Sequence, residues 1–440
     1  MRCVLIAVGS RGDIQPLIAL ALGLKRAGWA VSFASHADFA ATALTHGLEF
    51  VRISGSSNQF YNGPASTALR DHIRTGGPDL KRFFDSYLSV FYRRHLHDVE
   101  AACADADLIL CWPWTRLAPT LAQWRGVPVM VLSVNPVIHL PTCTYPNPFQ
   151  YPRRRTLGVV RNRLSWRAGE AIAGIGQQAL DTWRVERLGL SPLPWREDLK
   201  RLRRMPHLFG VSPLVMPKPW DWAPWIQVTG YWFLDERSAY EPAPDLAAFL
   251  AAGPPPVAIG FSSQVGRDAR GLQRIIAEGV AASGRRALLI AGYGRTTGME
   301  LPTNLHAVQT VPYDWLFPRL AAMIHHGGAG SAAAALRWGL PNAAIPFGYE
   351  QGFWGHRIAR LGVGPAPVFA EDLTAERLAA LIRCLADDPH YRRRAAALAG
   401  PLADEDGVAR AVALIERRVW EATGRRPAGL GRVAAAGGTG

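Results

Sequence analysis

Short apolar runs alternate with helical patterns along the first half of the chain. Apolar residues fill RCVLIAV near the N-terminus and recur in WAVSFAS, LEFVRI, DLILC and VPVMVLS, with amphipathic segments between them. Such runs, bounded by glycine or polar residues, are typical of strands buried on both faces. Strands separated by helices of this length form βαβ units, so the pattern predicts a parallel sheet.

The alternation starts again after a proline-rich stretch, with PVAIGF, RRALLIAG, LHAVQ, AAMIHH and NAAIPF as a second set of predicted strands. A chain of 440 residues is too long for one ordinary core. We therefore predict an α/β protein with two Rossmann-like domains whose parallel sheets face each other across a cleft, with the ligand at the carboxyl ends of the strands. The predicted parts are 1–234, a linker at 235–256, a second domain at 257–424 and a disordered tail at 425–440.

Two long insertions, 54–100 and 139–206, interrupt the first domain with aromatic and basic segments. Insertions at the ends of sheet strands usually shape a binding site.

Composition narrows the class of protein. Hydrophobic residues make up 49% and charged residues 19%, which is a globular balance. No apolar run reaches the roughly 20 residues that a membrane-spanning helix needs. The N-terminus is expected to be a first strand rather than a signal peptide. The five cysteines show no CxxC spacing, which favours a reducing cytoplasm over a disulfide framework or a zinc site.

The net charge of +14 is concentrated in one stretch, 151–204, which holds 13 Lys or Arg against five Asp or Glu. Trp166, Trp183 and Trp195 are interleaved with these charges. A solvated helical surface and docking on an anionic membrane face are both open interpretations. No nucleic-acid recognition motif accompanies the charge, so we expect no nucleic-acid partner.

One segment of the second half, AAMIHHGGAGSAAAAL, combines a strand, a glycine-rich turn and a helix. Glycines let the backbone approach a ligand closely, and free amides at a helix start attract anions. His326 can donate to a leaving diphosphate as charge builds on it, whereas a tight turn with a capping serine is the alternative. Consecutive strand residues point to opposite faces, so His325 and His326 are not expected to share a metal. The candidate donor-binding residues are His326, Gly328, Ala329, Gly330 and Ser331.

Glu350 and Gln351 stand between the strand NAAIPF and the next helical pattern. A carboxylate beside an amide can hold sugar hydroxyls through several hydrogen bonds. An ordinary helix N-terminus with an acidic first turn is the alternative. Their place just beyond the glycine-rich turn favours the sugar-binding interpretation.

The first strand leads into GSRGDIQP, which departs from GxGxxG and does not predict a dinucleotide site. Pro16 is expected to open the next helix, with Asp13 placed to cap it. The functional interpretation makes Asp13 a general base that removes the proton of an acceptor hydroxyl. Ser10, Arg11 and Gly12 would then lie close to the diphosphate or the acceptor.

Two further pairs are weaker signals. Ser262 and Ser263 end the first strand of the second half and are candidates for donor binding, although a plain turn is equally consistent with them. Asp105 and Asp107 form a DxD between a helix and a strand, which we interpret as solvated caps. Serine-hydrolase, Walker and zinc-hydrolase motifs are absent from the sequence, so we expect neither a metal nor a cofactor.

These motifs resemble those of the UDP-glycosyltransferases, in particular the bacterial and fungal sterol 3-β-glucosyltransferases and the related antibiotic-glycosylating enzymes. The resemblance runs from Val4 to about Pro367 and rests on GSRGDIQP, PTCTYPNPF, IQVTGYWFLD, PVAIGFSSQ and the long segment from VPYDWLFP to LGVGPAP. It implies a GT-B fold, an acceptor-binding first domain and a nucleotide-sugar-binding second domain. The implied reaction is an inverting, metal-independent transfer of glucose or a related hexose from a UDP- or dTDP-sugar to a hydroxyl of a small hydrophobic acceptor, such as a sterol, a lipid or a polyketide-like product.

The resemblance also implies roles for individual residues. In that family the aspartate of GSRGD is the proposed base, the HHGGAG loop holds the diphosphate and an acid–Gln pair reads the sugar. Those roles fall on Asp13, on 326–331 and on Glu350 and Gln351, while Val311 to Trp315 would frame the nucleobase.

Three motifs depart from the family pattern. Ser331 replaces the usual Thr, YEQG replaces GDQP so that Glu350 stands for Asp and Gly352 for Pro, and GFSSQ replaces GFGSM. The longer acid bears directly on the choice of donor sugar. A retaining GT-B enzyme, a catalytically silent nucleotide-sugar-binding homologue and a peripheral membrane protein are the alternatives, and the intact acid, histidine and glutamine argue against silence.

Overall fold

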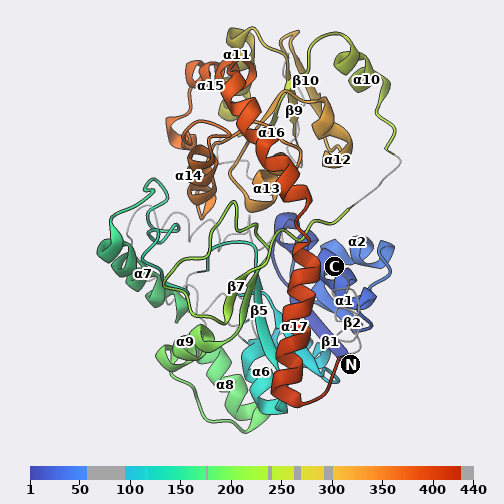
Figure 1. Ribbon diagram of the computed structural model, residues 1–440, viewed down its shortest axis with the longest axis vertical. Coiled ribbons are helices and arrows are strands. Elements are labelled where there is room, and N and C mark those ends of the chain that lie inside the picture. The colour runs from blue at the N-terminus through green and yellow to red at the C-terminus, as the bar shows by residue number, and fades with distance from the viewer. Residues whose placement is uncertain are drawn as a thin grey trace, which may run out of the picture. The chain divides into compact units, whose positions relative to one another are not determined.

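The computed structural model describes residues 1–56, 95–113, 115, 117–137, 139–174, 177–235, 240–261, 269–291 and 301–427 (Figure 1). The chain divides into two compact units. The first consists of Met1–Gln150, Thr156–Leu234 and Asp406–Gly440, and the second of Tyr151–Arg155 and Asp235–Glu405.

In the described part of the first unit, seven parallel strands form one sheet in the order β3-β2-β1-β4-β5-β6-β7. The strands are β1 (Arg2–Ala7), β2 (Ala30–His36), β3 (Glu49–Ile53), β4 (Leu108–Cys111), β5 (Val129–Ser133), β6 (His207–Phe209) and β7 (Ile226–Val228). The first five coincide with the predicted apolar runs. The order reverses between β1 and β4, and the crevice outside the carboxyl ends at such a switch point is the usual ligand site of an α/β sheet.

Helices surround this sheet (Figure 1). They are α1 (Arg11–Arg26), α2 (Ala40–Thr45), α6 (Leu117–Arg125), α7 (Val159–Ala173), α8 (Gln177–Leu188), α9 (Trp195–Arg204) and α17 (Gly407–Thr423). The prediction that Pro16 opens the first helix was wrong, because α1 begins five residues earlier with Ser10 as its N-cap. Pro16 is the sixth residue of α1, past the first turn, so the helix forms without the hydrogen bond that an N–H at this position would donate to Gly12 O.

The second unit contains a five-stranded parallel sheet in the order β10-β9-β8-β11-β12, within the residues that the structure describes. Its strands are β8 (Val257–Gly260), β9 (Ala287–Ile290), β10 (Leu305–Val308), β11 (Ala322–His325) and β12 (Asn342–Ala344). Its helices are α10 (Pro244–Ala251), α11 (Ala269–Ser283), α12 (Tyr313–Leu316), α13 (Ala329–Arg337), α14 (Gln351–Leu361), α15 (Ala375–Asp387) and α16 (Pro389–Ala403). Here the switch point lies between β8 and β11, so the loop after β11 is placed to bind a ligand.

Alternate residues of each strand in this sheet enter different cores. Val257 and Ile259 of β8 belong to one apolar cluster, whereas Ala258 belongs to another. Successive side chains of a strand point to opposite faces, so both faces are covered by helices. The continuous apolar runs of the sequence follow from this double burial.

Two expected boundaries differ from the observed grouping. Residues 235–256 were expected to be a linker, but the segment contains α10, whose Leu246 is 1% exposed and packs in a core of the second unit. Residues 257–424 were expected to form the second domain, but α17 groups with the first unit. It packs along α1, where Val408 lies against Gly23, and Trp29 Nε1 donates to Glu416 Oε1 at 3.3 Å.

No helix among the described residues is long and apolar enough to cross a membrane. All five cysteines are free, and burial raises the pKa of the Cys3 and Cys103 thiols to about 12.

Candidate functional site

The glycine-rich turn of the second unit runs from the end of β11 into α13. Gly327 has a φ of 87°, and a Cβ there would lie 2.6 Å from the carbonyl oxygen of Gln351. A Cβ on Gly328 would lie 2.4 Å from His326 Nε2. Glycine at these two positions therefore lets the turn pack directly against the start of α14 and beneath the His326 ring. The turn and the Glu350–Gln351 pair, which are separated in sequence, lie side by side.

The helix that follows begins at Ala329, with Gly328 as its N-cap and no side chain capping it. The first backbone amides of a helix have no partner within the helix. The amides of Ala329, Gly330 and Ser331 thus present the partial positive charge that favours an anion. The helix start and the predicted diphosphate loop coincide.

The two histidines at the end of β11 have different surroundings. His325 is fully buried, receives a hydrogen bond from Gly327 N at 3.0 Å on Nδ1, and its Nε2 is 3.3 Å from Asn342 Oδ1. His326 is partly exposed, but its Nδ1 is buried without a partner among the described residues. The planes of the two rings lie 86° apart, and their centroids are separated by 6.4 Å. That the two histidines do not share a metal stays a prediction.

Both histidines are electrically neutral over the ordinary pH range. Burial lowers the pKa of His325 to about 4. Burial, with a smaller contribution from His325, lowers the pKa of His326 to about 3. His326 can therefore act as a neutral hydrogen-bond donor, and His325 serves to hold the turn to Asn342.

The Glu350–Gln351 pair forms the start of α14, with Glu350 as its N-cap and Gln351 as its first residue. The Gln351 side chain is 4% exposed, and its Oε1 accepts from Phe347 N at 2.7 Å. This bond fixes the amide so that its NH₂ group is the end left to donate. Tyr349, which precedes the pair, has a φ of 54°, and strained backbone of this kind concentrates at ligand-binding loops.

In the first unit, Asp13 is the third residue of α1 and is 6% exposed. Its Oδ2 accepts from Ser10 N at 2.8 Å and from Ser10 Oγ at 2.9 Å. A Cβ on Gly9 would lie 2.6 Å from the same oxygen, so glycine is required there. Asp13 thus completes a capping box as well as facing the loop after β1, and Arg11 is exposed beside it.

Asn135 is a neighbour of Asp13 that the sequence did not indicate. It follows β5, and its Nδ2 is 3.4 Å from Asp13 Oδ1. Only the parallel order of β1, β4 and β5 brings the two residues together. The carboxylate of Asp13 is therefore oriented from two sides, by Ser10 and by Asn135.

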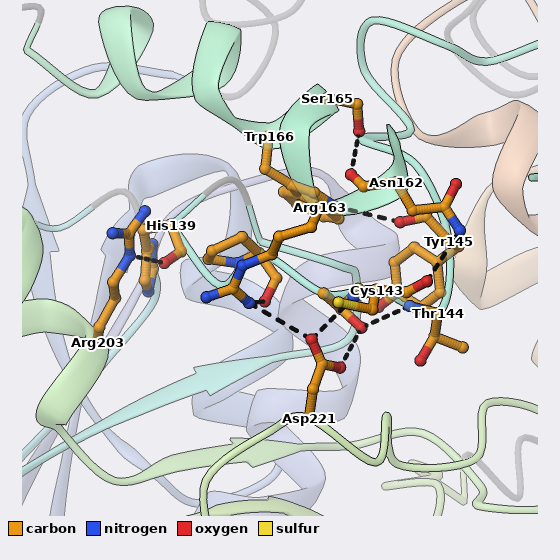
Figure 2. Close-up of polar contacts among 12 residues, drawn as sticks. His139, Cys143, Thr144, Tyr145, Asn162, Arg163, Ser165, Trp166, Arg203 and Asp221 are labelled. Atoms are coloured by element: carbon orange, nitrogen blue, oxygen red, sulfur yellow. Dashed lines mark hydrogen bonds and ion pairs between the residues drawn. The ribbon is translucent and has the colours of Figure 1, made fainter. Parts of the chain in front are cut away.

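The insertion after β5 is held by polar contacts around the PTCTYPNPF segment. Asp221 accepts from Thr142 Oγ1 at 2.7 Å and from Cys143 N at 2.8 Å. The contact between Asp221 and Cys143 can be followed in Figure 2. Asn162 of α7 donates from Nδ2 to Cys143 O at 2.9 Å (Figure 2). Trp166, also on α7, donates from Nε1 to Tyr145 O at 3.2 Å. Because this loop begins next to Asn135, the insertion starts at the sheet edge where Asp13 lies.

The two residues expected at the nucleobase belong to, or pack against, an apolar cluster that also includes Ala335 of α13. Val311 is 7% exposed and packs in a core of the second unit. The Trp315 ring lies 4.2 Å from the Arg319 guanidinium and edge-on to Tyr240. Trp315 and Arg319 line a pocket of about 420 Å³ whose other walls come from residues 242–255. Their part in donor binding stays a prediction.

The remaining candidates divide as follows. Ser262 and Ser263 lie outside the described residues. Asp107 accepts from Arg2 N at 2.8 Å and pairs with Arg425 at 2.7 Å, so it ties the chain ends to β4. These two contacts agree with a structural role for Asp107 of the DxD pair.

The basic stretch is divided between interior and surface. Trp166 and Trp183 are buried. Several arginines bind groups within the first unit, including Arg184 to Thr120 Oγ1 at 3.0 Å and Arg203 to His139 O at 2.9 Å (Figure 2). The aromatic part of the predicted surface is thus mostly core, whereas the exposed basic residues are spread over 153–155, α7, α8 and α9.

Comparison with known proteins gives the family. The N-terminal domain model of glycosyltransferase family 28 matches residues 3–85, and the C-terminal domain model of the erythromycin biosynthesis protein CIII-like proteins matches residues 288–412. An O-mycaminosyltylonolide 6-deoxyallosyltransferase of Streptomyces fradiae is 34% identical over 435 residues, which cover 96% of this chain and 98% of that protein. The chain belongs to the UDP-glycosyltransferase family.

The sterol branch of the family is also similar, but its members are longer. A sterol 3-beta-glucosyltransferase of Arabidopsis thaliana is 31% identical, with 94% of this chain and 64% of that protein covered. In the fungal sterol 3-beta-glucosyltransferase of Emericella nidulans, also 31% identical, the chain spans 30% of the relative. The chain therefore corresponds to a part of these sterol relatives and to nearly the whole of the Streptomyces fradiae enzyme.

Solved structures bear on the fold alone. The calicheamicin glycosyltransferase CalG4 matches with a TM-score of 0.67 at 17% identity, covering 97% of this chain and 100% of that chain. The glycosyltransferase VinC, solved in complex with dTDP, matches with a TM-score of 0.61 at 19% identity, covering 96% and 100%. The predicted GT-B fold is confirmed.

Proposed function

We propose that this chain is an inverting glycosyltransferase that moves a hexose from a UDP- or dTDP-sugar to a hydroxyl of a small hydrophobic acceptor. The observation that carries this proposal is the contact of Gly327 with Gln351, which joins an anion-binding helix start to a sugar-binding pair on one sheet edge. The Streptomyces fradiae and Arabidopsis thaliana relatives, a deoxyallosyltransferase and a sterol glucosyltransferase, support the same class of reaction.

The donor diphosphate would bind at the start of α13. The amides of Ala329, Gly330 and Ser331 provide donors, and the helix dipole favours negative charge there. His326 adds a neutral N–H donor, and its buried unpartnered Nδ1 gives a reason to expect a further hydrogen-bond partner when donor is present. As the bond between sugar and diphosphate breaks, these groups would stabilise the growing charge on the leaving group.

Asp13 would be the general base. Its carboxylate is oriented by Ser10 and Asn135, and it would remove the proton from the acceptor hydroxyl as that oxygen attacks the anomeric carbon. Attack from the side opposite the leaving diphosphate inverts the configuration. The proposed mechanism needs no metal, because α13 and His326 supply the charge stabilisation.

Gln351 and Glu350 would read the sugar hydroxyls. Gln351→Glu keeps an oxygen that accepts from Phe347 N but removes the NH₂ donors. We expect this variant to raise the donor KM and to lower kcat, because sugar contacts that tighten in the transition state affect both constants. Its melting temperature is measured alongside, because a carboxylate at a 4% exposed position is costly to bury. Glu350→Asp should change the ranking of donors more than the total rate.

The measurement is a competition among UDP-glucose, UDP-galactose and dTDP-sugars with wild type and both variants, run with and without EDTA. Gln351→Ala, which also loses the bond to Phe347, serves as the comparison for a folding defect. Unchanged product ratios in Gln351→Glu and Glu350→Asp would show that the sugar is read elsewhere. Loss of all activity in EDTA, restored by Mg²⁺ or Mn²⁺, would contradict the metal-independent mechanism.

We further propose that α7 docks on an anionic membrane surface. Val159, Val160 and Leu164 are 58%, 70% and 45% exposed on this helix, and the exposed Arg161 and Arg167 lie among them. Apolar side chains mixed with arginines fit the interface of a bilayer that carries negative headgroups. Such docking would bring the acceptor-binding unit to a source of hydrophobic acceptors.

Arg161→Gln/Arg167→Gln should weaken binding to vesicles containing phosphatidylglycerol by roughly 30-fold, since each charge near an anionic surface contributes about 1 kcal/mol. Val160→Asp should also release the protein. The control is Leu44→Asp, which changes a 59% exposed leucine outside α7. Equal sedimentation of all four proteins with these vesicles would rule out docking through α7.

A further inference from the structure

Five consecutive residues of the chain group with a different unit from the residues on either side of them. Gln150 and Thr156 belong to the first unit, whereas Tyr151–Arg155 between them belongs to the second. Ordering these five residues costs conformational entropy, so contacts with the second unit must stabilise their conformation. Those contacts are made with the start of α14 and with the turn η3 (Ala370–Asp372).

Arg153 anchors the segment to η3. Its guanidinium forms ion pairs with the Glu371 carboxylate and with Asp372 Oδ2, the latter at 2.7 Å. The same group lies 4.4 Å from the centroid of the Phe369 ring. Two carboxylates and an aromatic face therefore hold one side chain, and the two acids raise the pKa of Arg153.

The backbone of the segment packs on one face of α14. A Cβ on Gly352 would lie 2.3 Å from Pro152 O and 3.2 Å from Phe369 Cζ. His356, four residues later on the same face, has a pKa that burial lowers and that backbone hydrogen bonds with Pro152 and Arg153 raise in part. The family pattern has proline at the position of Gly352, and a proline ring there would overlap the Pro152 carbonyl. The segment can therefore occupy its observed position only because this chain has glycine there.

Gly352 directly follows Gln351, so the segment lies against the first turn of α14 behind the Glu350–Gln351 pair. The loop before the pair contains the strained Tyr349. A strained loop keeps its conformation only when its surroundings fix it. The segment supplies part of those surroundings.

We infer that Tyr151–Arg155 is a specificity-determining clamp on the sugar-binding loop, with Arg153 as the positioning residue that holds it. The inference rests on the proposed function, because it concerns the choice among the hexoses that the enzyme would transfer. It assigns part of that choice to residues that do not touch the sugar. Exposed ion pairs are individually weak, and the clamp depends on two of them together with the aromatic contact and the close packing on Gly352. We therefore expect changes on the order of tenfold rather than complete loss.

The decisive variant is Glu371→Gln/Asp372→Asn, which frees Arg153 and leaves the tryptic sites at Arg153, Arg154 and Arg155 intact. The matched control is Asp387→Asn, which breaks an exposed pair between Arg285 and Asp387 at 2.9 Å in the same unit. Two quantities are measured: the rate of tryptic cleavage within 153–155, followed by mass spectrometry, and the product ratio in the donor competition. Cleavage does not depend on activity, so it tests the clamp separately from the reaction.

We expect the rate of cleavage to rise by about tenfold in the double variant, and the donor ratio or donor KM to change by a similar factor. Asp387→Asn should behave like wild type in both measurements. Gly352→Ala should reproduce both effects, because its methyl group would displace Pro152. Unchanged cleavage would overturn the clamp, and faster cleavage with unchanged donor preference would overturn its role in specificity. A wild type that transfers no sugar from any donor would instead refute the proposed function, and the inference with it.

Discussion

Replacing Asp13 by Asn is expected to lower the rate of sugar transfer by about 10²–10⁴-fold, the usual contribution of a general base. The amide is close in shape to the carboxylate, and its oxygen can still accept from Ser10 N. It cannot take the proton of the acceptor hydroxyl. The loss should therefore fall on kcat, while donor binding at the second unit stays unchanged.

Asp13 also belongs to a capping box, so a loss of stability has to be separated from a loss of chemistry. Removing a charge from the first turn of a helix costs about 0.3–1 kcal/mol. Asp406→Asn is a matched control, because Asp406 caps α17 in the same unit by accepting from Ala409 N at 2.8 Å. The two variants should melt alike, whereas only Asp13→Asn should lose activity. Turnover of Asp13→Asn within about threefold of wild type would remove it from the role of base.

Gly327→Ala is expected to abolish high-affinity donor binding. The residue has a φ of 87°, and a methyl group there would meet the Gln351 carbonyl at 2.6 Å, a backbone atom that cannot turn aside. Either the turn or the start of α14 must move, and that movement separates the glycine-rich turn from the Glu350–Gln351 pair.

Gly284→Ala provides the control for backbone strain. Gly284 has a φ of 63° in the same unit, and a Cβ there would meet nothing within 4 Å. A left-handed conformation costs a non-glycine residue about 1–2 kcal/mol, so this variant should melt a few degrees lower and bind donor normally. We expect Gly327→Ala to melt lower still and to weaken UDP or dTDP binding by more than about tenfold in calorimetry. Equal affinities for the two variants would mean that the Gly327–Gln351 contact plays no part in the site.

The sequence indicated most strands and most of the candidate site because local patterns encode them. An apolar run such as that of β1 indicates a strand covered on both faces, and the glycines of HHGGAG indicate the turn into α13. It failed at α1, where Pro16 suggested a helix start, because proline favours the first position of a helix, whereas α1 begins at Arg11 and contains Pro16 as its sixth residue. It also missed the helix in 235–256, since a proline-rich composition describes α10 and a linker equally well.

The sequence by itself determined two α/β units, the order in which their strands appear along the chain and the loops that are candidates for the site, since hydrophobic period and glycine position act over a few residues. Only the tertiary structure decided which distant residues meet. It placed Asn135 beside Asp13, Gln351 against Gly327, and Pro152 on Gly352. It also assigned α17 to the first unit, because an amphipathic helix specifies that one face is buried but not which core covers it. Contacts of this kind depend on strand order and close packing, which no local pattern records.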